Sequence, residues 1–320
     1  MGNGDGPVWG ELSFLVSPGT VADWRMAVLY EAAAGAGLLA ALPAAPAHLA
    51  EGLGLDERAV RVVLDALSVW GVVEAGDGGV YVAGPGAPAA EPAAVVRHHA
   101  RSIRLWSGQL GDRLRGVAAA PAPAADPAQV ELWLEALAVN GRESAPGTVD
   151  ACLARAPAAS RVLDLGGGHG EYALEFARRG LHATMQDRQV VIDIARRQGR
   201  LAEAGVELFA GDFFDVLADG AFDIVFCSGV SYTYDGERNL ALFRRVKPLI
   251  APGGSLVLHT FLRGTDELAS IFAVQMLGAT GGGDTHAEDD YRRWLDAAGY
   301  RSVASVRLDR RPESLVLAAP

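Results

Sequence analysis

The chain has 320 residues, of which 50% are hydrophobic and 21% charged, so it is long enough for two ordinary domains and too apolar to be disordered. Its net charge of −11 argues against nucleic acid or an anionic membrane surface as a partner. The amino terminus lacks the basic and apolar regions of a signal peptide, and no apolar run is long enough to span a membrane. These features predict a cytoplasmic protein.

The first 90 residues predict a small domain of helices followed by a hairpin. Apolar residues at helical spacing predict helices over residues 21–42, 48–52 and 57–70, and Asp56 is placed to cap the last of them. Residues 72–74 and 80–82 flank a glycine-rich turn and predict a β-hairpin. Three helices and a hairpin in this order are typical of a winged helix.

A winged helix commonly binds DNA through its third helix. Here Glu57 and Asp65 cancel Arg58 and Arg61 on that helix, which leaves no basic face for phosphate. The helix over residues 21–42 carries more apolar surface than one helical face needs. We therefore expect residues 1–90 to form a dimerisation domain of a homodimer, with a ligand-sensing DNA-binding regulator as the alternative.

A second region, residues 91–157, predicts helices with no motif of their own. A Pro- and Gly-rich segment over residues 84–92 precedes a helix over residues 93–114, and a low-complexity loop over residues 117–127 follows it. Two further helices are predicted over residues 130–138 and 144–154. We expect this region to be a helical linker that roofs a substrate pocket.

A glycine-rich turn follows a strand at residues 162–173, which read VLDLGGGHGEYA. Residues 162–165 form an apolar run typical of a buried parallel strand, and a helical pattern begins after Gly170. Glycines permit the tight turn and let a ligand lie against bare backbone. Strand, glycine turn and helix begin a βαβ unit that holds a nucleotide-like ligand.

Acidic residues end the next two predicted strands. Asp187 ends the second strand about 20 residues past the glycines, where a carboxylate can accept hydrogen bonds from a ribose diol. Asp212 and Phe213 follow the third strand, where an acid and an aromatic ring suit an adenine. With Ser228 at the end of the fourth strand, the predicted cofactor-binding residues are Asp164, Gly166, Gly168, Asp187, Asp212, Phe213 and Ser228.

This order of glycine loop, second-strand acid and third-strand acid with aromatic resembles the class I S-adenosylmethionine (SAM) methyltransferases. NAD enzymes resemble it less, because their G-x-G-x-x-G pattern is not completed after Gly170. From residue 161 onward strands and helices alternate, with helices expected near 170–180, 190–204, 237–250 and 288–298. The last two strands, near 301–308 and 313–318, are joined by a short turn. We expect residues 158–320 to form an α/β Rossmann-like domain whose seven-stranded sheet ends in an antiparallel hairpin.

From about residue 21 to the end, the chain resembles bacterial small-molecule O-methyltransferases that carry a winged-helix dimerisation domain. The resemblance implies SAM as cofactor, a small natural-product acceptor and a homodimer. In that family a histidine after the fourth strand removes the proton of the acceptor hydroxyl. Counting back without a gap from residues 251–254 (APGG) places Tyr232 at the histidine and Tyr234 at a family tryptophan, while Asp235 keeps the acid.

The tyrosine changes the expected chemistry. An ordinary Tyr has a pKa near 10, so it is a poor general base at neutral pH. Three explanations of the tyrosine stay open. The acceptor hydroxyl can be acidic enough that the enzyme needs only to position it, or another residue can serve as the general base. Alternatively, the protein can bind SAM without carrying out the usual O-methylation. We predict methyl transfer in line to O, C or N of the acceptor, with a non-methylating reaction (decarboxylation, hydroxylation or pericyclic) as the alternative.

Several residues are candidates for the missing base. His286 lies in a loop that resembles the substrate-facing loop of the family, and Asp290 matches an acid that orients the family histidine. The predicted catalytic residues are therefore Tyr232, His286 and Asp290. His259 ends a strand near the ligand-binding edge and is equally well explained as a core histidine. We predict no metal, because His259 and His286 lack the close spacing of a ligand pair.

Apolar and aromatic residues near the predicted pocket indicate a flat or apolar acceptor. Those that we expect to contact it are Trp106, Tyr234, Phe272 and Met276.

Overall fold

The computed structural model of the protein describes residues 24–117, 126–309 and 311–320. The chain divides into two compact units, Met1–Arg104 and Leu105–Pro320, and the boundary falls within the long helix α4 (Ala90–Leu114). Residues 21–23 of the first predicted helix lie outside the described residues.

The first unit consists of three helices followed by a hairpin, in the order predicted. These are α1 (Trp24–Gly35), α2 (Pro46–Leu53), α3 (Glu57–Val69) and the antiparallel strands β1 (Val73–Ala75) and β2 (Tyr81–Ala83). The Asp56 carboxylate accepts a hydrogen bond from the Ala59 N–H at 2.8 Å and so caps α3, as expected. Leu64 and Leu67, at helical spacing on α3, are fully buried in the core of this unit.

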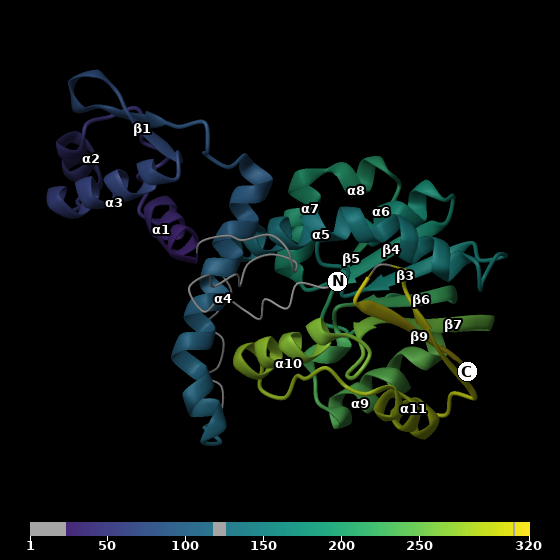
Figure 1. The fold of residues 1–320 in the computed structure, drawn as a ribbon. Coiled ribbons are helices and arrows are strands. Elements are labelled where there is room, and N and C mark those ends of the chain that lie inside the picture. Colours follow the sequence, from purple (N-terminus) through teal and green to yellow (C-terminus); the bar gives the residue numbers. More distant parts are fainter. Residues whose placement is uncertain (1–23, 118–125, 310) are drawn as a thin grey trace, which may run out of the picture. The chain divides into compact units, whose positions relative to one another are not determined.

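The second unit is built on one seven-stranded sheet, drawn in Figure 1. Its strands are β3 (Arg161–Leu165), β4 (His182–Asp187), β5 (Glu207–Ala210), β6 (Phe222–Ser228), β7 (Ile250–Phe261), β8 (Ser302–Arg307) and β9 (Glu313–Ala319). Their order is β5-β4-β3-β6-β7-β9-β8, with β3 to β7 parallel and β9 antiparallel to both neighbours. The Rossmann-like sheet with an antiparallel end hairpin is therefore confirmed.

Helices cover both faces of this sheet, which explains why its strands are nearly continuous apolar runs. Figure 1 shows α5 (Pro127–Leu153), α6 (Glu171–Arg178) and α7 (Gln189–Gln198) on one face, and α9 (Gly236–Val246) and α11 (Glu288–Ala297) on the other. Residues that alternate along a strand face opposite sides, so Val162 packs with the first group of helices and Leu163 with the second. Two hydrophobic cores result, one on each face.

Three helices differ from the prediction. The two helices expected over residues 130–138 and 144–154 are one helix, α5, which continues through Pro146. The helix expected over residues 190–204 breaks into α7 and α8 (Arg200–Glu203) at Gly199, whose φ of 75° is left-handed. The helix α10 (Glu267–Ala279) was not predicted, because its sequence is apolar on all sides and has no helical periodicity.

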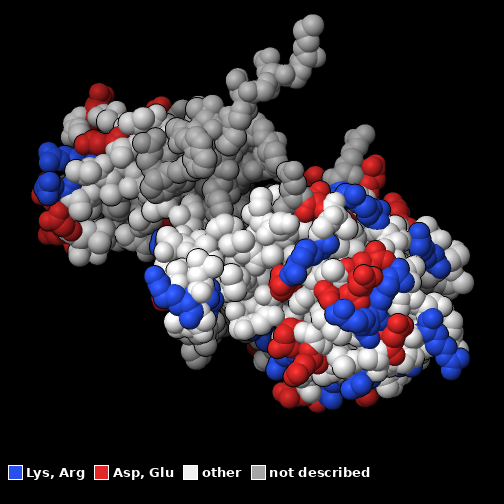
Figure 2. Space-filling model, turned by 60° about the horizontal axis from the view of Figure 1, so that its bottom comes forward, with Lys and Arg blue, Asp and Glu red and all other residues white. Residues whose placement is uncertain are grey.

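Charges of both signs are mixed on the face of the molecule that Figure 2 shows. Figure 2 shows one face, on which Lys and Arg side chains alternate with Asp and Glu side chains over the described part. A surface of mixed sign has no strong attraction for a phosphate backbone. Among the described residues, no helix combines the length and the apolar character needed to cross a bilayer.

Candidate active site

The glycine-rich turn lies where β3 ends and α6 begins. Gly166, Gly168 and Gly170 have φ of 72°, 52° and 75°, a left-handed conformation that side chains disfavour. A Cβ atom on Gly166 would also lie 2.6 Å from a methyl group of Val230. The sequence therefore needs glycine here for both backbone conformation and space, and the turn lies at the carboxyl edge of the parallel strands, where such sheets bind ligands.

Asp187, at the end of β4, is hydrogen-bonded to this turn. Its Oδ2 accepts from the Gly168 N–H at 2.9 Å and its Oδ1 from the Arg188 N–H at 2.7 Å. The side chain is 12% exposed, and burial raises the pKa of its carboxyl. Each oxygen keeps a second lone pair, so the carboxylate can also accept from two hydroxyl groups of a ligand.

A set of buried contacts holds the glycine turn from its other side. Glu171, at the first turn of α6, pairs with Arg142 of α5 at 3.3 Å and with Arg200 of α8 at 2.5 Å. The His169 ring lies against Gly141 of α5, where a Cβ would come within 2.4 Å of the ring. Burial lowers the pKa of His169 to about 4, so this ring is neutral and structural.

Asp164 is a fully buried acid near the carboxyl end of β3. Neither carboxylate oxygen has a hydrogen-bond partner of normal geometry. Burial, together with the nearby Asp187 carboxylate, raises the pKa of Asp164 to about 7. A buried acid with unpaired oxygens beside a ligand-binding turn is typical of a functional position.

Aromatic rings gather beyond β5. Asp212 is exposed and accepts from the Phe214 N–H at 2.8 Å, which folds the chain so that Phe213 lies near Gly166. The ring of Tyr234 meets Phe213 at 6.4 Å and Phe214 at 5.3 Å, edge to face in both cases. The structure therefore groups Tyr234 with the predicted adenine-binding residues, whereas the sequence analysis placed it with the acceptor.

Tyr232 lies in a short 3₁₀ turn, Ser231–Thr233, directly after β6. Asn239 holds this segment, because its side-chain amide donates to the carbonyls of Ser231, Tyr234 and Asp235 at 2.9 to 3.1 Å. The Tyr232 ring is half-buried, and burial raises the pKa of its phenol well above the ordinary value. The phenol is therefore not a proton acceptor near neutral pH.

The two other predicted catalytic residues are bonded elsewhere. His286 donates from Nε2 to the Tyr234 carbonyl at 2.8 Å and packs edge to face against Trp294. Asp290 accepts from the Ala287 N–H at 2.9 Å, which caps α11, and pairs with Arg293 at 2.5 Å. Through these partners both side chains stabilise the segments around Tyr232. A catalytic role for His286 or Asp290 stays a prediction.

An apolar wall stands next to Tyr232. Phe272 of α10 meets the Tyr232 ring edge to face at 4.8 Å and stacks on Phe261 of β7 at 4.5 Å. On α10, Met276 is buried, and Gln275 accepts a hydrogen bond from the Trp106 indole. The predicted acceptor residues Trp106, Phe272 and Met276 are thus brought to one region, through the helix that the sequence analysis missed.

Polar side chains lie on the same side of the sheet. Ser228 Oγ, at the end of β6, lies 2.8 Å from Nδ1 of His259 on β7, and the Tyr172 hydroxyl lies 2.7 Å from Ser144 Oγ. Burial lowers the pKa of His259 to about 3, so its imidazole is neutral. Tyr172 and Ser144 were not predicted as site residues, because no sequence motif marks a hydroxyl on the inner face of a helix.

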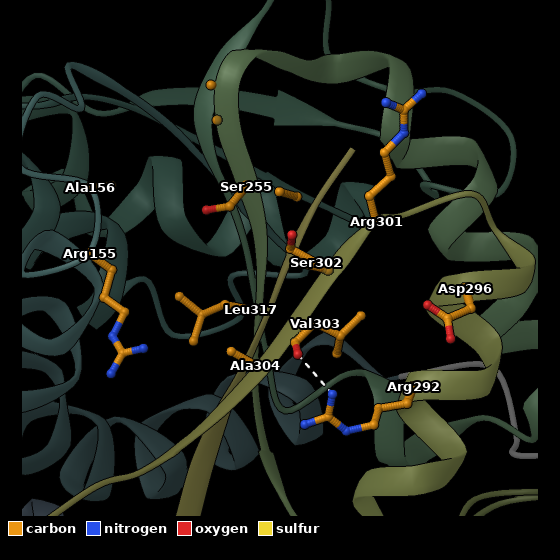
Figure 3. A pocket seen from close by; sticks show the side chains of 14 residues that line it. Arg155, Ala156, Ser255, Arg292, Asp296, Arg301, Ser302, Val303, Ala304 and Leu317 are labelled. Atoms are coloured by element: carbon orange, nitrogen blue, oxygen red, sulfur yellow. Dashed lines mark hydrogen bonds between the residues drawn. The ribbon is translucent and has the colours of Figure 1, made fainter.

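An open cavity of about 610 Å³ lies at the opposite edge of the sheet (Figure 3). Its lining includes Ser255, where β7 begins to pair in parallel with β6, and Ser302 at the start of β8. Figure 3 shows Arg155 and Arg301 at opposite sides of it. Ligands of open α/β sheets bind at the carboxyl edge, so this cavity is not the cofactor site.

Residues 139–305, just over half of the chain, match the family model described as "Methyltransferase domain". The chain belongs to this methyltransferase family. Its glycine turn, Asp187 and Asp212 all fall inside the matched residues.

Two curated relatives are methyltransferases from Streptomyces. The chain is 33% identical over 161 residues to 3-amino-4-hydroxybenzoate 4-O-methyltransferase of Streptomyces cremeus, which covers 46% of this chain and 43% of that protein. It is 27% identical over 157 residues to 3-hydroxy-5-methyl-1-naphthoate 3-O-methyltransferase of Streptomyces sahachiroi, with coverage of 46% and 45%. The matched part thus spans less than half the length of each relative.

A solved structure named PigF with SAH resembles nearly the whole chain. The TM-score is 0.72 with 20% identity, over 93% of this chain and 96% of that one. This likeness shows that the fold of that structure extends over both units.

The cofactor of the family is SAM, and the residues at the carboxyl edge fit it. The Asp187 carboxylate has lone pairs left that would suit ribose hydroxyls, the Phe213 and Tyr234 rings would suit an adenine face, and Asp164 is a buried acid with unpaired oxygens under the glycine turn. Among the described residues, no three metal-ligating side chains lie together.

Proposed function

We propose that this methyltransferase transfers the methyl group of SAM to a hydroxyl group of a small aromatic acceptor. The observation that carries the proposal is the glycine turn hydrogen-bonded to Asp187 at the sheet edge where the half-buried aromatic wall also lies. Both curated relatives are named for O-methylation of aromatic hydroxyl groups. A natural product is the proposed source of the acceptor. No observation favours the non-methylating alternative.

Bound SAM supplies a methyl group already activated on a sulfonium. In this proposal Asp187 and the glycine turn fix the adenosine end, while Tyr234, Phe213 and Phe214 cover the base. Phe272 and Phe261 hold the acceptor ring flat and exclude water. Alignment of the acceptor oxygen with the methyl carbon then provides most of the rate enhancement.

The proton of the acceptor hydroxyl needs no tyrosinate in this mechanism. Tyr232 cannot accept it near neutral pH, because burial raises its pKa. We propose that the acceptor is an acidic phenol or enol, which ionises on its own. The Tyr232 ring serves to pack on Phe272 and to shape the pocket.

A binding experiment tests the cofactor site. We expect Asp187→Ala to weaken SAM binding at least tenfold in calorimetry, because a carboxylate that accepts from ribose hydroxyls is lost. Asp193→Ala is the matched control, since Asp193 is an exposed acid on the neighbouring helix α7. Equal affinity of the two variants, or no SAM binding by the natural chain, would reject the proposal.

A transfer experiment tests the reaction. Methyl-labelled SAM is incubated with phenols, enols, 2-oxo acids and indoles, and both demethylated SAM and acceptor mass are followed. Label on a phenol or enol supports the proposal. A changed acceptor with intact SAM would instead establish the non-methylating alternative.

We also propose that the protein is a homodimer joined through a winged-helix unit. The support is the order of three helices and a hairpin in the first unit, with exposed apolar residues such as Val62 and Val69 on α3. Light scattering at micromolar concentration is expected to show twice the mass of the chain. A monomer would contradict the proposal.

A further inference from the structure

Polar side chains gather on one face of the sheet beside the apolar wall. Phe226, Val257 and Leu315 belong to the core under α5 and α6, and side chains two residues along a strand face the same side. Ser228, His259 and Glu313 stand two residues from these three, toward the edge that carries Tyr232. Three neighbouring strands thus present a serine, a histidine and a glutamate to one buried region.

Two atoms of this group are buried and have no hydrogen-bond partner. They are His259 Nε2 and Glu313 Oε2, and the two residues are 4% and 8% exposed. His259 pairs across the strands with Leu315, and Glu313 with Phe261, so the two are diagonal neighbours with Cβ atoms about 7 Å apart. Buried polar atoms without partners are rare, and each calls for a ligand, a water or a functional reason.

The surrounding contacts hold both side chains in place. Ser228 fixes His259 through Nδ1 at 2.8 Å, and the ring stands edge to face against Tyr172 at 5.4 Å. Arg311 lies 3.8 Å from Glu313 Oε2 and is itself bonded to Asn140 of α5 at 3.1 Å. These contacts leave Nε2 of His259 without any partner and Oε2 of Glu313 with only the long ion pair to Arg311.

The position of the pair beside the aromatic wall points to the acceptor, although His259 also meets Ser228 and Tyr172 near the glycine turn. Glu313 is on β9 and His259 on β7, whereas the glycine turn follows β3, two strands away from β7. Phe261, the direct strand partner of Glu313, stacks on Phe272, and these rings are half-buried. An aromatic molecule lying on Phe261 and Phe272 would therefore have its edge next to the polar pair.

We propose that His259 and Glu313 form the polar end of the acceptor pocket and hydrogen-bond a hydroxyl group of the aromatic acceptor other than the one that is methylated. This inference rests on the proposed function. A hydroxyl group is the simplest match, because it can donate to a carboxyl oxygen of Glu313 and can either donate to or accept from the imidazole. Burial and the nearby Arg311 disfavour imidazolium, so His259 binds as a neutral group.

The test uses dihydroxynaphthalenes and dihydroxybenzoates, each paired with its monohydroxy counterpart. Binding is measured by calorimetry on the full chain, with and without S-adenosylhomocysteine, so it does not depend on methyl transfer. We expect at least one dihydroxy compound to bind 10- to 100-fold more tightly than its counterpart, the effect of one or two buried hydrogen bonds. If no pair shows such a preference, the inference is overturned.

Variants assign the preference to the pair. We expect His259→Phe and Glu313→Leu each to reduce this preference to less than threefold, while SAM affinity falls far less than in Asp187→Ala. This difference separates the inference from the proposed cofactor site. Thr148→Val is the matched control. Thr148 Oγ1 is also buried and has no hydrogen-bond partner, but Thr148 lies further along α5 than Asn140, the residue that bonds Arg311. If the preference for dihydroxy compounds survives in His259→Phe, the inference is overturned, and a buried water is left as the partner of the pair. If Glu313→Leu does not fold, the result with His259→Phe alone tests the inference.

Discussion

At the scale of single residues, Asp164 links the cofactor site to stability. Its pKa of about 7 in the folded chain lies far above the ordinary value of 3.8, which it has when unfolded. The folded state therefore binds more protons between pH 4 and 7, and the contribution of this residue to stability falls as the pH rises through that range. Asp164→Asn removes the effect, because the amide does not ionise.

Without ligand, we expect the stability of Asp164→Asn relative to the natural chain to be about 2–3 kcal/mol more favourable at pH 8 than at pH 5 in thermal unfolding. The comparison of the two proteins at each pH cancels the effects of other titrating groups, and the comparison between pH values cancels the pH-independent effect of the substitution. The same variant is expected to lose SAM affinity, since an acid kept at a cost in stability is typical of a binding site. An equal change at both pH values would contradict the raised pKa.

Tyr232 carries a second residue-scale prediction. Because its phenol is protonated near neutral pH, we expect Tyr232→Phe to keep kcat/KM within about threefold and to leave the pH profile unchanged. Tyr232→Ala, which also removes the ring that packs on Phe272, is expected to lower kcat/KM more strongly. Steady-state kinetics from pH 6 to 9 with the identified acceptor measure both. A loss above 100-fold in Tyr232→Phe would assign the hydroxyl a catalytic role.

At the scale of elements, a glycine substitution can test the contact between α5 and the glycine turn, which Gly141 and His169 form. Gly141→Ala would place a Cβ 2.4 Å from the His169 ring, so we expect a loss of about 1–3 kcal/mol and weaker SAM binding. Gly147→Ala on the same helix meets nothing within 4 Å, and there the better helix propensity of alanine should stabilise by up to about 1 kcal/mol. Thermal unfolding and calorimetry compare the two. A shift of the same sign in both would contradict the contact.

Elements also show which parts of the structure could be predicted. The glycine turn and Asp187 were found because their signal is local: a strand pattern, then a turn that only glycine can form. The helix α10 was missed because an apolar sequence without periodicity does not distinguish a helix from a strand. The partners of His286 and Asp290 could not be predicted, because they depend on how α11 packs against the segment that carries Tyr234.

At the scale of the whole molecule, the two units have separate cores, and only the second carries the predicted cofactor residues. A ligand stabilises what it binds by RT ln(1 + [L]/Kd), which is about 2.7 kcal/mol at 100 times Kd. We expect S-adenosylhomocysteine at this concentration to slow hydrogen exchange of core amides in β3 and β6 by roughly 100-fold, because these exchange by unfolding of the second unit.

Core amides of α3, such as those of Leu64 and Leu67, serve as the internal control. If the units unfold independently, their exchange stays unchanged when ligand is added, since the ligand has no differential affinity for the two states of the first unit. An equal slowing in α3 and β6 would show that both units unfold as one cooperative body. If exchange slows in neither α3 nor the strands β3 and β6, the protein does not bind the cofactor product. The same measurement therefore tests both the coupling between the units and the assignment of the cofactor site.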